Sequence, residues 1–170
     1  LIPLKLKCDV KKLFDETEEF VYLKYNPRKD IERYGLSITS LDGSLNGIDL
    51  DSIKEYNKEN NTEYDELSFN KFTKVYHTSS EIQKIVEPFK NHIGRSHILS
   101  LQEGGYFPPH RDLPVYVEQQ NSLRILVPLK GCNPPDMYFM YEDKPLHFEH
   151  GRAYFLNTNK SHNLFSFKGS

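Results

Sequence analysis

Residues 94–112, "GRSHILSLQEGGYFPPHRD", are the stretch from which the fold of this chain is best predicted. The segment 96–102 alternates polar and apolar residues as a pleated strand does, and the following "EGG" is a turn signal. Further strand-like segments then follow, separated by turn residues, at 122–129, 137–143, 146–150, 152–158 and 162–167. Short strands that recur about every 8 to 12 residues are typical of a β-sandwich or β-barrel.

The part of the chain before this stretch gives fewer signals. Segment 20–26, "FVYLKYN", predicts a strand because it is rich in aromatic and β-branched residues. Segment 78–94 predicts a helix, with Ser79 or Ser80 as its cap, a glycine at its end and a bend at Pro88. We therefore expect a mainly β fold with flanking helices.

Length and charge narrow the class of protein. A chain of 170 residues fits one domain, 1–170, and its net charge of −2 includes no sustained basic run, which argues against nucleic acid as a partner. The two cysteines, Cys8 and Cys132, follow no paired spacing, so a reducing, cytoplasmic location is expected. No apolar stretch reaches the roughly 18 residues of a membrane span. The chain begins at Leu1, which is compatible with a piece of a longer protein.

The motif "HRD" offers two side chains that suit a metal ion. In an extended segment residues i and i+2 point to the same side, so His110 and Asp112 can approach one point. His162, at the start of the last strand-like segment, is a candidate third ligand. Two histidines and one carboxylate form the facial triad of non-heme Fe(II) oxygenases. By chance alone, about 0.4 such H-x-D triplets are expected in a shuffled chain of this composition, so the triplet is weak by itself.

The surroundings of this motif resemble a known family. "GRSHILSLQEGGYFPPHRD", "SLRILVPLKG" and "HFEHGRAYFLNTNKSHNLFSF" are similar to the core of the aspartyl/asparaginyl β-hydroxylase-like branch of 2-oxoglutarate and Fe(II)-dependent oxygenases, which includes proline-hydroxylase-like members. The positions that carry the resemblance are Gly105, Pro109, His110, Leu123, Arg124, Pro128, Leu129, Gly151, Phe155, Asn157 and His162. Residues 1–77 add nothing to it.

The resemblance implies a fold. It is a double-stranded β-helix (a cupin-like jelly roll) over residues 94–170, without its last strand in this chain. Residues 1–93 would supply strands and helices that support the barrel, with Tyr22, Tyr25 and Tyr34 in a candidate substrate lid.

The resemblance also implies a site. His110, Asp112 and His162 would bind Fe(II), and Arg124, Ser100 and Lys168 would bind the cosubstrate 2-oxoglutarate. With O2, the enzyme would hydroxylate a free amino acid or a Pro, Asp or Asn residue in a peptide or protein, releasing succinate and CO2. The sequence departs from the family pattern in two places. Leu126 replaces a histidine, and Lys168 is the only cation in the tail where the family has an arginine.

Other interpretations remain open. The same three ligands would serve a different cupin-type metalloenzyme that does not use 2-oxoglutarate, or "HRD" could be a structural turn in a non-catalytic jelly-roll binding module. We expect His97 to be a hydrogen-bonded core or rim residue instead of a ligand. Tyr116 and Gln119, between the metal motif and Arg124, are candidate substrate contacts. The sequence does not reveal the oligomeric state.

Overall fold

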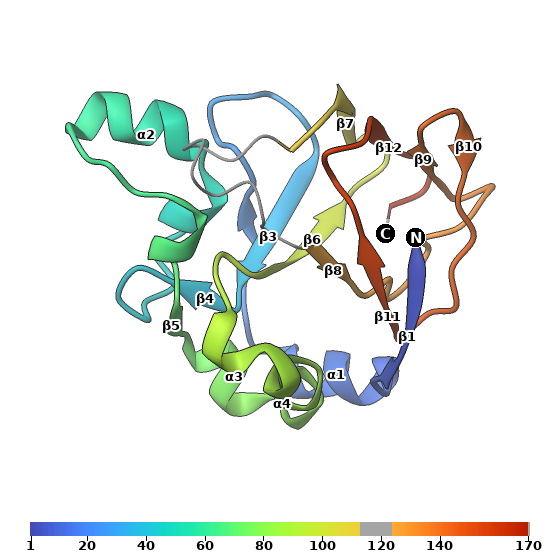
Figure 1. Cartoon of the computed structure of the whole chain (residues 1–170), viewed down its shortest axis with the longest axis horizontal. Helices are drawn as coiled ribbons and strands as arrows, with labels where there is room; N and C mark the ends of the chain where they lie inside the picture. The colour runs from blue at the N-terminus through green and yellow to red at the C-terminus, as the bar shows by residue number, and fades with distance from the viewer. Residues whose placement is uncertain (113–123, 170) are drawn as a thin grey trace.

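The computed structural model describes residues 1–112 and 124–169 (Figure 1). Most of its regular structure is antiparallel β-sheet, which confirms the prediction of a mainly β fold with helices. The strands are β1 (Ile2–Lys7), β2 (Leu23–Lys24), β3 (Arg33–Ser37), β4 (Thr39–Ser40), β5 (Lys71–Phe72), β6 (His97–Leu101), β7 (Tyr106–His110), β8 (Arg124–Leu126), β9 (Met137–Tyr141), β10 (Lys144–Pro145), β11 (Arg152–Leu156) and β12 (His162–Ser166). The helices are α1 (Val10–Thr17), α2 (Ile53–Asn60), α3 (Lys74–Thr78) and α4 (Ser80–Val86), with 3-10 turns η1 (Ile48–Leu50), η2 (Glu66–Ser68) and η3 (Glu87–His92).

Two sheets pack face to face in the C-terminal part of the chain. One has the strand order β10-β9-β12-β7 and the other β1-β11-β8. Alternate residues of β9 and β11 point into the space between them, since side chains on a strand alternate between faces. The buried residues of this core are Met137, Phe139, Phe148, Tyr154 and Leu156.

The third sheet, β2-β3-β6, carries a helical layer on one face (Figure 1). Leu36 and Ile98 are opposite each other in β3 and β6, and both pack against helices α1, α3 and α4. The helices contribute Leu13, Val75, Tyr76, Ile82 and Val86 to this core. Side chains at the alternate positions of β3 and β6 point to the opposite face of the sheet, and these include Arg33 and His97.

The N-terminal strand β1 is a finding that the sequence analysis missed. It pairs with β11, with Ile2 opposite Phe155 and Lys7 opposite Arg152. Its sequence "IPLKLK" alternates apolar and polar residues after Pro3, a signal that could have revealed it. The six residues of this strand are therefore part of the C-terminal sandwich.

The predicted strand 146–150 is wrong. Residues 146–150 contain no strand: the short β10 ends before them, and the backbone of Phe148 is hydrogen-bonded to a side chain instead. The amide of Asn133 accepts a hydrogen bond from the Phe148 N–H (2.7 Å) and donates one to its carbonyl oxygen (3.0 Å). Both backbone groups are satisfied without a strand partner, which leaves the Phe148 ring free to pack in the core.

The predicted helix 78–94 begins where expected but changes type. Ser79 is the cap, and its hydroxyl accepts from the Ile82 N–H. The α-helix ends at Val86 and a 3-10 turn follows, because Pro88 has no N–H with which to continue the α-helical pattern. The predicted strand 20–26 is reduced to β2.

Within the residues described, no helix combines the length and apolarity that a membrane crossing would require.

Candidate metal centre

An irregularity in strand pairing orients His110. Two steps along β12, from His162 to Leu164, correspond to three steps along β7, from His110 back to Phe107. The extra residue makes a β-bulge around Pro108–Pro109, and prolines are tolerated there because β7 is an edge strand of its sheet. His162 and Leu164 share one face of β12, so their partners His110 and Phe107 also share a face. Leu164 packs against the sandwich core, and the bulge therefore turns His110 toward the core side of the sheet.

The glycine pair before β7 ties this strand to β12. The Gly104 N–H donates to the carbonyl of Ser166 (2.9 Å), and the Ser166 N–H donates to the carbonyl of Gly105 (2.9 Å). Gly104 has a φ of +77°, which suits glycine. A Cβ on Gly105 would lie 2.2 Å from the carbonyl oxygen of Glu32, so only glycine fits this position without movement.

His110, Asp112 and His162 come together at one end of the sheet. His110 ends β7 and His162 begins the antiparallel β12 directly opposite it. The Nε2 atoms of His110 and His162 lie 3.5 Å and 3.9 Å from Asp112 Oδ1. Among the residues that the structure describes, these three are the group whose side chains could hold a metal ion, with potential ligand atoms all within 4.8 Å of one another.

Both imidazole rings are held by their other nitrogen. His110 Nδ1 is 2.7 Å from the carbonyl oxygen of Pro108, and His162 Nδ1 is 2.9 Å from that of Lys160. A carbonyl only accepts hydrogen bonds, so Nδ1 of each ring carries the proton and Nε2 of the neutral ring offers a lone pair. Contacts of this kind fix the tautomer and orientation of metal-binding histidines.

Asp112 is fixed by its backbone and by its second carboxylate oxygen. Its N–H donates to the Thr158 carbonyl (2.9 Å), and Arg124 Nε donates to Oδ2 (3.2 Å). Oδ1 is left facing the two histidines. Burial raises the pKa of Asp112, but hydrogen bonding from His110 and the charge of Arg124 outweigh it, and this pKa lies well below its usual value. The same contact with Asp112 raises the pKa of His110.

This donor set fits a divalent metal ion. An ion bonded to nitrogen and oxygen ligands at about 2.1 Å holds two ligand atoms no farther apart than about 4.2 Å. Both distances from Asp112 Oδ1 to the histidine nitrogens are below that limit. Imidazole and carboxylate ligands together suit iron, manganese or zinc.

Two of the residues expected to bind the cosubstrate lie apart from this group. Ser100 is opposite Tyr34 in the β3–β6 pair, on the same face as the helices, and lines an open cleft of about 450 Å³ with Tyr22, Tyr34 and Gln102. Lys168 is largely exposed, and its Nζ pairs with Asp136 at 2.9 Å. The third, Arg124, does lie beside the group.

The residues expected at a substrate lid divide between two places. Tyr22 and Tyr34 line the cleft described above. The Tyr25 ring lies instead on the metal-facing side, 5.4 Å from both the His97 and the Phe107 rings. Tyr116 and Gln119 lie outside the described residues.

Two side chains near Tyr25, those of His97 and Arg33, each have a buried polar atom that the sequence did not reveal. His97 was expected to be hydrogen-bonded, but among the described residues its buried Nδ1 has no partner. Burial, followed by the charges of Arg95 and Arg124, holds the pKa of His97 well below its ordinary value. Arg33 was not expected to be buried. It is 5% exposed, and its Nε also has no partner among the described residues.

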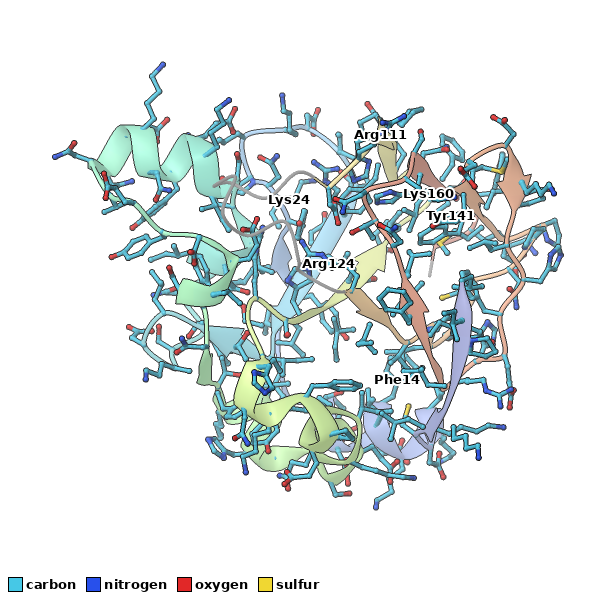
Figure 2. The ribbon with its side chains drawn as sticks, viewed as in Figure 1. Phe14, Lys24, Arg111, Arg124, Tyr141 and Lys160 are labelled. Atoms are coloured by element: carbon cyan, nitrogen blue, oxygen red, sulfur yellow. The ribbon has the colours of Figure 1, made fainter. Side chains whose placement is uncertain are left out.

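A polar hollow of about 320 Å³ lies beside the end of β7. Arg111 and Lys160 line it, and Figure 2 shows them at the same end of the molecule as Tyr141. The Tyr141 hydroxyl donates to the Asn157 carbonyl (3.0 Å), and Lys160 pairs with Glu142 (3.2 Å). These contacts fix the turn from which His162 emerges.

Comparisons with known proteins add no assignment. A scan against protein-family models found no match to this chain, and a search of curated proteins found no similar sequence.

Proposed function

We propose that the chain is a 2-oxoglutarate- and Fe(II)-dependent dioxygenase of the aspartyl/asparaginyl β-hydroxylase-like branch. It would hydroxylate a free amino acid or a Pro, Asp or Asn residue in a peptide or protein. The observation that carries the proposal is the group His110, Asp112 and His162, in which both Nε2 atoms face one carboxylate oxygen.

The arrangement of the strands supports a double-stranded β-helix as the finer description of the fold. Two antiparallel sheets enclose one core, and the metal-binding group lies at the end of β7 and the beginning of β12. In this interpretation β3 and the helical layer are additions that extend one side of the barrel, and so is β6, although it lies within the range 94–170 expected for the barrel.

The proposed roles of the residues follow from their contacts. Bound iron with 2-oxoglutarate supplies the activation of O2 and the hydroxylation of a C–H bond, with release of succinate and CO2. Asp112 presents Oδ1 because Arg124 holds Oδ2. The Phe139 ring lies nearly parallel to His162 at 6.1 Å and shields that side of the site from water. Arg124, 36% exposed, can also present its guanidinium to a carboxylate of the cosubstrate.

The test is reconstitution with Fe(II) under anaerobic conditions, followed by assay of succinate formation. The substrates would be proline, aspartate, asparagine and peptides that contain them. His110→Ala is expected to abolish iron binding and turnover. His92→Ala is a matched control, because His92 is exposed in η3.

Each outcome points to one interpretation. Iron binding without succinate formation from any substrate would favour the metalloenzyme that does not use 2-oxoglutarate. A wild-type protein that binds no divalent metal would favour the non-catalytic binding module. Unchanged iron binding and turnover in His110→Ala would contradict the proposed site.

A further inference from the structure

Arg33 is a buried cation that has no acidic partner among the described residues. It lies in β3 and is 5% exposed. Its Nη1 donates to the carbonyl oxygen of Tyr106 (3.2 Å), while its buried Nε has no partner among the residues described. No carboxylate in the described ranges, 1–112 and 124–169, forms an ion pair with it. A buried charge is costly unless it is paired, so this guanidinium is suited to receive an anion.

One aromatic ring, that of Phe107, connects the guanidinium to His110 of the metal centre. The Arg33 Cζ is 4.4 Å from the centre of the Phe107 ring and 5.5 Å from that of Tyr25. The Phe107 ring is in turn 6.3 Å from the ring of His110. Because Arg33 is on the face of β3 opposite the helices, it points to the same side as this chain of rings.

A second guanidinium and a histidine lie on this side of β3. Arg95 donates to the backbone carbonyls of Asp49 and Asp51 instead of to a carboxylate, and its Cζ is 5.8 Å from the Tyr25 ring. The Tyr25 ring thus contacts two guanidinium groups. His97, with its unpartnered Nδ1, lies against the same ring at 5.4 Å. Of the acids on this side, Asp112 is engaged by Arg124, and Asp49 accepts a hydrogen bond from Ser37 (2.7 Å) and lies near Arg95, whose side chain bonds to its backbone carbonyl.

We propose that Arg33 binds a carboxylate group of a ligand that occupies the metal centre. This inference rests on the proposed function, which supplies two ligands with carboxylates: 2-oxoglutarate and an amino-acid substrate. The planar guanidinium suits either, since it forms two parallel hydrogen bonds with a carboxylate. Phe107 and Tyr25 hold the group in place through cation–π contacts.

The alternative is a structural role, in which Arg33 only joins β3 to β7 through the Tyr106 carbonyl. The two roles predict different stabilities. Arg33→Met keeps a long side chain and removes the buried charge. If Arg33 serves a ligand, the ligand-free variant should unfold at the same temperature as the wild type or higher, because an unpaired buried charge is lost. A structural role predicts a lower unfolding temperature and no specific effect on ligands.

The experiment is calorimetric titration of the full chain loaded with Mn(II), which binds the same kind of site without turnover. The probes are 2-oxoglutarate, and then proline, aspartate and asparagine in the presence of saturating 2-oxoglutarate. Arg33→Met is expected to weaken binding of the ligand that Arg33 contacts by about 10- to 100-fold, and Arg33→Lys by a smaller factor. Arg28→Met is the control, because Arg28 forms its own ion pairs with Asp51 and Glu59.

The outcomes separate the two ligands. If Arg33→Met binds 2-oxoglutarate more weakly, Arg33 contacts the cosubstrate. If it binds only an amino acid more weakly, Arg33 contacts the substrate. If Arg33→Met binds every probe as the wild type does, or if it loses affinity only in proportion to a loss of folded protein, the inference is wrong. If the Mn(II)-loaded wild type itself binds no 2-oxoglutarate, the proposed function fails instead.

Discussion

The two adjacent glycines before β7 allow a sharp test of how the turn supports the metal centre. In Gly104→Ala the new Cβ meets nothing within 4 Å. The loss of stability comes only from the left-handed backbone conformation at this position, where φ is +77°. That cost is about 1 kcal/mol. In Gly105→Ala the new Cβ would lie 2.2 Å from the Glu32 carbonyl oxygen and 2.9 Å from that of Gln102. Both atoms belong to the backbone and cannot rotate away.

The expected magnitudes differ because of these contacts. Glu32 and Gln102 are joined by a hydrogen bond of 2.9 Å, so relief of the clash must displace the turn from β3. We expect Gly105→Ala to lower the free energy of unfolding by about 3 kcal/mol, at the upper end for overpacking. For a chain of this size the unfolding temperature would fall by about 6–12 °C, against about 2–4 °C for Gly104→Ala.

Thermal unfolding followed by circular dichroism, with a divalent-metal titration of each variant, measures both effects. Gly105→Ala should also bind metal more weakly, since the displaced turn is hydrogen-bonded to Ser166 at the end of β12. Gly104→Ala should retain the affinity of the wild type. A Gly105→Ala variant as stable as Gly104→Ala would refute the reasoning that the close approach to Glu32 positions β7.

Three further predictions follow from the described contacts. Deletion of Pro109 removes the extra residue of the bulge and should turn His110 away from the core. A metal titration of this variant should show no binding, whereas Pro109→Ala should retain the affinity of the wild type. Equal affinities of the two variants would contradict the proposed register. Although burial raises it, the pKa of Glu16 is lowered to about 2 by hydrogen bonds, beginning with that from Ser79. The stability that Glu16 contributes is therefore present above its ordinary pKa of 4.5 and is lost as the pH falls toward 2, so urea unfolding of Glu16→Gln should depend less on pH in that range. Leu156→Ala, at a core position 2% exposed, should cost about 2–5 kcal/mol in urea unfolding, and a cost below about 1 kcal/mol would show that the sandwich core is misplaced.

The group His110, Asp112 and His162 could be predicted from the sequence because two of its members obey the two-residue period of a strand. The sequence could not predict why His110 faces the core, because the bulge depends on the register between β7 and β12. Ser100 shows the same limit. Its strand was predicted, but the face that Ser100 occupies is set by the helices that cover Leu36 and Ile98.

Arg33 shows a different limit. In the sequence "ERYGLS" it resembles any exposed charge at the start of a strand, and nothing local reveals that it is buried. Its position results from packing against Phe107, far away in the chain. A lone buried cation is a property of tertiary structure and not of the local sequence.

The prolines of the bulge have a second consequence, for association between molecules. Among the described residues β7 is the last strand in the order β10-β9-β12-β7, and such an outer edge could template pairing with a strand from another chain. Pro108 and Pro109 carry no amide hydrogen and the bulge distorts the strand, so a regular intermolecular ladder cannot extend along this edge. The residues that orient His110 thus also protect the open side of the sheet from aggregation, and a variant that straightened β7 would lose both properties together.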